Sequence, residues 1–133
     1  MGIQWSENLM VGHPVLDVDH ADIIQKINQF ETLIDRKTDR KHLAQHYSNI
    51  VECLSDHFVR GERIILVAKY PDSEMHLSTH GDLFVKLSNM TILIEIDGHD
   101  TEAVILKSLH NWLFWHVITL DKSLSSFLHY SLS

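Results

Sequence analysis

The sequence predicts an all-α fold, an antiparallel up-and-down four-helix bundle in which residues 1–133 form one domain. The chain contains only two prolines and five glycines, so long helices are permitted almost everywhere. Apolar residues recur at steps of three and four along four long segments, as on one face of a helix. Short loops separate these segments, which favours antiparallel neighbours. An extended segment is expected before the first helix.

The first two helices are defined by their apolar stripes and by the breaks around them. The first is expected from about Asp17 to Arg36, with a stripe formed by Ile23, Ile27, Phe30 and Ile34. Thr38-Asp39 supplies a break and a possible N-cap for the second helix. This helix must end near Tyr70, because Pro71 restricts the residue before it. Its stripe comprises Leu43, Tyr47, Ile50, Leu54, His57, Gly61, Ile64 and Ala68.

The third and fourth helices follow the same spacing. Asp72-Ser73 can cap a third helix that ends at Gly98, with a stripe of His76, His80, Leu83, Leu87, Met90 and Ile94. The fourth is expected to begin at Asp100 or Thr101, with a stripe of Ala103, Leu106, Leu109, Leu113 and His116. A short helical tail to about His129 completes the predicted bundle.

Composition narrows the class of protein. Apolar residues make up 44% of the chain and charged residues 22%, which is ordinary for a soluble globular domain. A formal charge of −7 argues against nucleic acid, since such binding depends on Lys and Arg neutralising phosphates. No apolar segment approaches membrane-spanning length, and the N-terminus lacks the features of a secretory signal. We therefore expect a cytoplasmic protein with no membrane partner, and its oligomeric state stays open.

Eleven histidines are an unusually high number for a chain of this length. His76 and His80 are four residues apart on an apolar stripe, which stacks two imidazoles within reach of one metal ion. His42 and His46 have the same spacing but polar surroundings, so they are expected on a solvated face. The apolar surroundings of the first pair therefore favour a metal site.

The predicted inner faces bring further ligands to the same region. His20, His57 and His116 add an imidazole from each of the other three helices, and cofactor sites in bundles are built from such inward side chains. Asp121 follows His116 by five residues and would face away on an ideal helix. It can join the site only if the helix ends or widens locally, as in a π-bulge.

The chain closely resembles the bacterial hemerythrins from Trp5 to about Leu128. The resemblance rests on the order and spacing of Trp5, Gly12-His-Pro-Val-Leu-Asp-Val-Asp-His20, His57-Phe58, Tyr70-Pro71, His76-x-x-x-His80 and Trp112-Leu-x-x-His116-x-x-x-x-Asp121. It implies an up-and-down bundle that holds two non-haem iron ions, oxo- or hydroxo-bridged. It also implies reversible dioxygen binding at the iron with fewer histidines.

The resemblance implies a ligand for each metal position. The three histidines of one iron are matched by His76, His80 and His116. The two histidines of the other iron are matched by His20 and His57, and the bridging aspartate is matched by Asp121.

Gly61 departs from the family pattern. Hemerythrins usually read His-Phe-x-x-Glu-Glu here, and the first glutamate is the second bridging carboxylate. This chain has Gly61 at that position and keeps only the second acid, Glu62. A glycine inside a helix costs about 0.5 to 1 kcal/mol, so the fold should survive. Water or a small carboxylate could fill the space, or Glu62 could become a substitute metal ligand through a local π-bulge. In a third alternative, the two-histidine position is weak or empty and the protein holds chiefly one metal. We favour two metals with an altered second position.

The function expected from these features is that of a non-enzymatic, non-haem di-iron protein. It would bind dioxygen for transport, storage or sensing through a site of five histidines and one aspartate, and small anions are further expected ligands. An alternative is a di-iron enzyme that reduces peroxide or nitric oxide, because His20, His57 and Asp121 form a two-histidine, one-carboxylate set. A metal-binding sensor with an altered site is a third hypothesis. Phe58, Trp112 and Trp115 are expected to pack the core.

Overall fold

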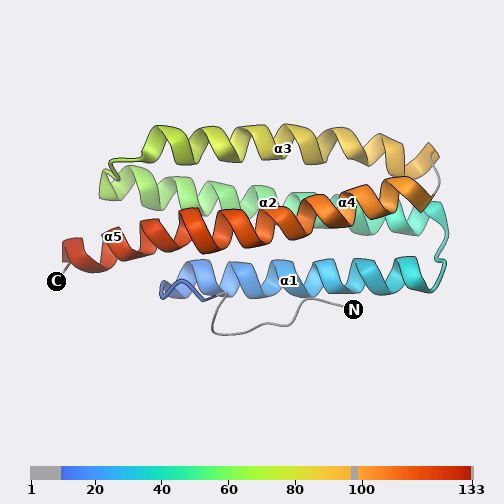
Figure 1. The fold of residues 1–133 in the computed structure, drawn as a ribbon, viewed down its shortest axis with the longest axis horizontal. Helices are drawn as coiled ribbons and strands as arrows, with labels where there is room; N and C mark the ends of the chain where they lie inside the picture. The colour runs from blue at the N-terminus through green and yellow to red at the C-terminus, as the bar shows by residue number, and fades with distance from the viewer. Residues whose placement is uncertain (1–9, 97–98, 133) are drawn as a thin grey trace.

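A computed structural model describes residues 10–96 and 99–132, which form a bundle of four helical rods that lie side by side (Figure 1). The rods are α1 (Pro14–Asp35), α2 (Arg40–Ala68), α3 (Ser73–Ile96) and a continuous run of α4 (His99–Trp112), the π-helix η2 (Leu113–Asp121) and α5 (Lys122–Leu132). The described residues contain no strand. The predicted all-α bundle is therefore confirmed. Trp5 and the predicted extended segment lie outside the described residues.

Helix α1 begins three residues earlier than the apolar stripe suggests. Pro14 occupies the first helical position, where its missing N–H is no loss. The Asp17 carboxylate accepts hydrogen bonds from the backbone N–H groups of Val11 at 2.7 Å and Gly12 at 3.2 Å. These bonds fix the path of the chain into α1, just before the part of the helix that carries His20.

Helix α2 has the predicted N-cap and ends close to the predicted residue. The Asp39 carboxylate accepts a hydrogen bond from the backbone N–H of His42 at 3.0 Å, as expected of an N-cap. The helix ends at Ala68 with Lys69 in the left-handed conformation at φ 54°, two residues before Pro71. Between these ends α2 is an uninterrupted α-helix, and Gly61 lies buried within it.

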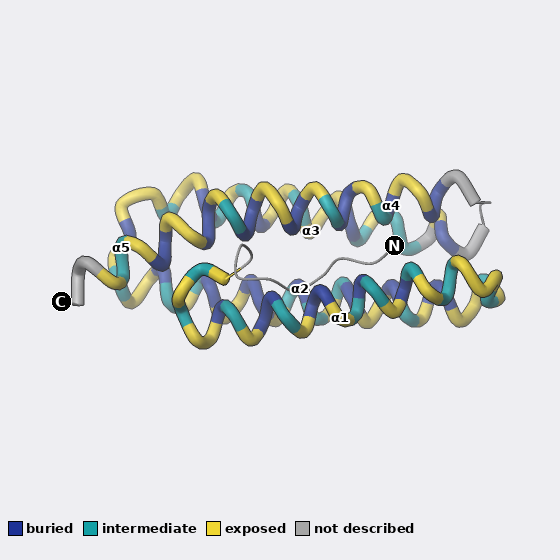
Figure 2. The backbone as a smooth tube through the Cα atoms, turned by 60° about the horizontal axis from the view of Figure 1, so that its bottom comes forward, coloured by how far each residue is buried: buried dark blue, intermediate teal, exposed yellow. Residues whose placement is uncertain are grey.

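The buried residues line the interior between the rods (Figure 2). The predicted stripes of α2 and α3 face this core, but one residue of the fourth stripe does not: Ala103 is exposed, and Ile105 is fully buried. Glu102 is also turned inward, where it pairs with Arg40 of α2. The inner face of α4 is therefore rotated relative to the predicted stripe, and the ion pair between helices occupies part of it.

Trp115 is a second correction. Its side chain was expected in the core but is 54% exposed, whereas Phe58 and Trp112 are both only 4% exposed. Trp115 directly precedes His116, whose side chain faces inward, so the tryptophan points outward. Among the described residues, no helix combines the length and apolarity that crossing a membrane would require.

Candidate metal centre

The π-helix η2 brings His116 and Asp121 onto one face. A π-helix joins each N–H to the carbonyl five residues earlier, so its turn is wider and side chains five apart lie nearer to one face than in an α-helix. His116 Nε2 lies 3.2 Å from Asp121 Oδ1. The local widening expected from the His116-to-Asp121 spacing is thus present, and it extends over all of η2.

The Asp121 carboxylate lies at the middle of the centre. Its Oδ2 is 2.8 Å from Nε2 of His20 and 3.3 Å from Nε2 of His57. Its Oδ1 is 3.0 Å from Nε2 of His76 and 3.2 Å from Nε2 of His116. One carboxylate therefore presents one oxygen to each of two sets of imidazoles.

These side chains form two groups that share the aspartate, with donor atoms no more than 4.8 Å apart within each group. The three-histidine group consists of His76, His80, His116 and Asp121. The two-histidine group consists of His20, His57 and Asp121. All six residues are buried, and all six were predicted as metal ligands from the sequence.

The donor set fits metal ions. His80 Nε2 and His116 Nε2 lie 3.0 Å apart, close to the separation of neighbouring ligands around an ion with metal–nitrogen bonds of about 2.1 Å. Imidazole and carboxylate are ligands for iron, zinc and related metals. The outer Nδ1 atoms of His20, His76 and His116 have no hydrogen-bond partner among the described residues. Their inner Nε2 atoms converge instead, as metal ligands do.

Two members of the three-histidine group, His80 and His116, favour the neutral form. Burial and the nearby rings of His116 and His76 lower the pKa of His80 to about 2. Burial also lowers the pKa of His116, although Asp121 acts in the opposite direction. Neutral rings keep the lone pairs that a metal ion needs.

The two-histidine group has more negative surroundings. Burial acts to lower the pKa of His57, but hydrogen bonds to Asp121 and Asp19 outweigh it and raise that pKa. Burial acts to raise the pKa of Asp121, yet its hydrogen bonds to the surrounding histidines hold it well below the usual value. Asp121 is therefore a buried anion, which suits a ligand shared by two cations.

Asp19 and Arg60 were not predicted as part of the centre. Asp19 Oδ2 accepts a hydrogen bond from Nδ1 of His57 at 3.0 Å. Arg60 binds both carboxylate oxygens, through Nε at 2.9 Å and Nη2 at 2.6 Å. Burial acts to raise the pKa of Asp19, but the hydrogen bonds from His57 and Arg60 lower it to about 2. The available sequence signal was an acid directly before His20 in Asp-Val-Asp-His.

Gly61 faces the centre, and Glu62 lies at its edge. A Cβ atom at position 61 would lie 3.8 Å from His80 Cε1, an ordinary van der Waals distance. Glu62 Oε1 lies 3.6 Å from the outer Nδ1 of His80, and its side chain is 39% exposed. Among the described residues, neither group includes Glu62. The π-bulge suggested around Gly61 is absent from α2, so a ligand role for Glu62 stays a prediction.

Aromatic rings stack on two of the candidate ligands, His80 and His116. Phe58 stacks on His80 with ring centres 4.3 Å apart and planes 14° apart. Trp112 stacks on His116 at 5.7 Å and 19°. These contacts fix the ring planes and place apolar surface beside the donor atoms.

Fold and site together define a four-helix-bundle protein with a buried histidine–aspartate metal centre. The chain is similar to curated proteins named bacteriohemerythrin: it is 26% identical over 113 residues to one from Stenotrophomonas maltophilia, covering 85% of this chain and 72% of that protein. It is 26% identical over 132 residues to one from Pseudomonas aeruginosa, covering 97% and 83%. No protein-family model matches the chain. The chain is thus similar to proteins named bacteriohemerythrin over most of its length, and its histidine–aspartate cluster fits a hemerythrin-like site.

Proposed function

We propose that this protein holds two non-haem iron ions and binds dioxygen, for transport, storage or sensing. The observation that carries the proposal is the sharing of one buried carboxylate, Asp121, between two groups of histidines. Two separate mononuclear sites would have no need of a common ligand. The relatives named bacteriohemerythrin support iron as the metal.

Each group would hold one iron. His76, His80 and His116 would bind one through their Nε2 atoms, and His20 and His57 would bind the other. Asp121 would bridge the two positions, since its two oxygens already face different groups. When bound, the irons supply the redox chemistry that reversible dioxygen binding requires.

The protein surroundings would keep the centre dry. The five histidines are at most 3% exposed, and Asp121 is 2% exposed. Phe58 and Trp112 cover the rings of His80 and His116. A dry, low-dielectric site favours a stable ligand complex, because it limits access of water and protons.

We propose that Gly61 stands where bacterial hemerythrins have a bridging glutamate. Glycine leaves the space beside His80 Cε1 without a side chain. Water or a small anion such as acetate would complete the two-histidine position, which has only Asp121 as a carboxylate ligand. The protein itself would then supply one negative charge fewer to the centre, which would bind external anions more tightly.

The test is metal content combined with an optical spectrum. The purified chain should contain two irons, and its reduced form should gain a new absorption band in oxygen that disappears under vacuum. A single tightly bound metal per chain would contradict the two-iron proposal. An irreversible change in oxygen would contradict the carrier role.

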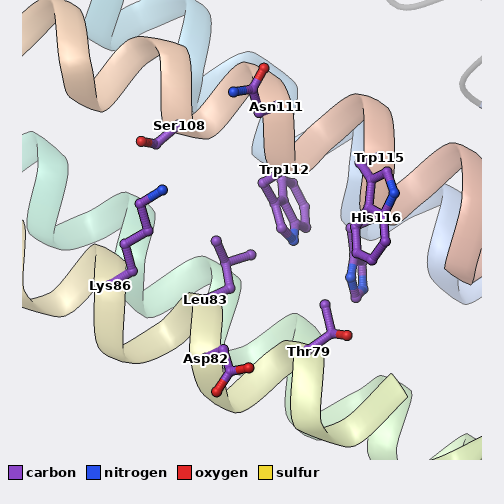
Figure 3. A pocket seen from close by; sticks show the side chains of 9 residues that line it. All are labelled: Thr79, Asp82, Leu83, Lys86, Ser108, Asn111, Trp112, Trp115 and His116. Carbon is purple, nitrogen blue, oxygen red and sulfur yellow. The ribbon is translucent and has the colours of Figure 1, made fainter. Parts of the chain in front are cut away.

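A cavity beside the centre favours an enzyme as the second candidate function. It has a volume of about 470 Å³ between α3 and α4, and its lining includes Leu83, Lys86, Trp112 and His116. Figure 3 shows Lys86 toward one end and the proposed metal ligand His116 toward the other. A small oxidant such as peroxide could approach the centre through it. Sustained peroxide consumption by the iron-loaded protein, at a rate lowered by Leu83→Trp, would favour this function over a carrier.

A further inference from the structure

His57 is held from its outer side by a carboxylate, which distinguishes it from the other proposed ligands. Its Nδ1 donates to Asp19 Oδ2 at 3.0 Å, while its Nε2 faces Asp121. Asp19 belongs to α1 and is 8% exposed, so this contact joins two helices inside the bundle. Asp19 is thus placed to determine which nitrogen of His57 carries the proton.

We propose that Asp19, held in place by Arg60, is a positioning residue that keeps the proton of His57 on Nδ1 and its Nε2 lone pair toward the metal. The proposal rests on the proposed function only in taking His57 as a metal ligand. Such carboxylate–histidine–metal arrangements fix the tautomer and the ring orientation, and they make the imidazole a stronger ligand. Asp19 would therefore strengthen the two-histidine position without touching the metal.

Arg60 gives the carboxylate its fixed orientation. Its Nε and Nη2 donate to both oxygens of Asp19, at 2.9 and 2.6 Å, in the planar fork that Arg forms with carboxylates. This leaves Oδ2 directed at His57 and prevents rotation of the carboxyl group. The Arg60 side chain is 45% exposed, so it covers Asp19 from the solvent side.

The other proposed ligands lack such an arrangement. Nδ1 of His20, His76 and His116 has no hydrogen-bond partner among the described residues. The Nδ1 of His80 has Glu62 at 3.6 Å, too far for a hydrogen bond. The outer carboxylate therefore occurs in the group with fewer histidines, where each ligand contributes a larger share of metal binding.

The first test determines the tautomer of His57 in the metal-free protein. Nitrogen-15 NMR of the histidine rings, at a pH high enough for His57 to be neutral, should show the proton on Nδ1. In Asp19→Asn the amide oxygen should stay with Arg60 and the NH₂ group should face His57, so the proton should move to Nε2. Asp22→Asn is the matched control, because it removes an α1 ion pair with Lys26 away from the centre. An Nδ1 proton in Asp19→Asn would overturn the proposal.

The second test measures metal binding by titration of the metal-free protein with ferrous iron under argon. Asp19→Asn should weaken the two-histidine step about 10- to 100-fold and leave the three-histidine step unchanged. Equal weakening of both steps would indicate only a structural role and would overturn the proposal. If the wild-type chain binds one iron, the two-iron function fails, and the NMR result alone decides the role of Asp19.

Arg60→Gln provides a variant that keeps Asp19 if Asp19→Asn does not fold. It should keep the Nδ1 proton but weaken the two-histidine step, because the carboxyl group is no longer fixed. Thermal unfolding of both metal-free variants, compared with Asp22→Asn, separates a loss of stability from a loss of metal affinity. Wild-type affinity at the two-histidine step in Arg60→Gln would contradict the part assigned to Arg60.

Discussion

The three-histidine group is crowded with imidazoles, whereas the two-histidine group is flanked by carboxylates. In the first, burial and the close imidazole rings lower the pKa values of His80 and His116. In the second, Asp19 and Asp121 lie on opposite sides of His57 and raise its pKa. One group thus offers three imidazoles, and the other offers two imidazoles with a further carboxylate, Asp19, behind His57. The two proposed metal positions are therefore expected to differ in affinity and in their need for an external anion.

The largest effect is expected from the residue that the two groups share. Asp121→Ala should remove the bridge and weaken both metal positions by more than about 100-fold, since loss of an outer partner alone costs 10- to 100-fold. Iron titration should then show no tight step. Retention of one wild-type step would show that Asp121 serves only one group.

The next prediction separates the two groups by removing one histidine from each. His57→Ala should leave a single tight iron, because the three-histidine group stays complete while the other keeps one imidazole. His80→Ala should leave two imidazoles and Asp121 at each position, the set that already serves the unchanged two-histidine position, so both irons should be retained. Iron analysis after dialysis measures the difference. Identical iron content in the two variants would contradict unequal groups.

Gly61→Glu should reduce the difference between the groups. The added carboxylate should strengthen the two-histidine position and weaken azide binding at least about tenfold, because two unit charges 4 Å apart repel by about 4 kcal/mol at an effective dielectric constant of about 20. Gly61→Gln is the matched control, with the same shape and no charge. Azide titration of the iron-loaded proteins measures the effect, and equal affinity in wild type and Gly61→Glu would count against an open position.

Glu62→Gln should have the smallest effect. The Glu62 side chain is 39% exposed, and its Oε1 lies 3.6 Å from Nδ1 of His80. Exposed ion pairs of this kind contribute about 0 to 1 kcal/mol to stability. Iron content should stay at the wild-type value, and affinity should change less than about fivefold. Loss of one iron would instead establish Glu62 as the substitute ligand.

The sequence predicted most of the fold because its signals are local. Apolar spacing identified the rods, and Asp39 was recognised as the N-cap of α2. Ala103 and Trp115 were placed wrongly, because the rotation of a helix depends on its neighbours as well as on its own stripe. The ion pair between Arg40 and Glu102 joins residues far apart in the chain, and no local pattern indicates it.

The sequence by itself determined the types of the candidate ligands, five histidines and an aspartate, and placed the five histidines on inward faces. Spacing along a helix is sufficient for the histidines, because the helical repeat converts separation into direction. Only the tertiary structure decided that η2 widens so that Asp121 meets His116, and that Asp19 and Arg60 meet His57 from another helix. The formation of a π-helix and the meeting of side chains from two helices both depend on how the whole bundle packs. The spacing of residues along the chain does not give the distance between Asp121 and His116, or between Asp19 and His57.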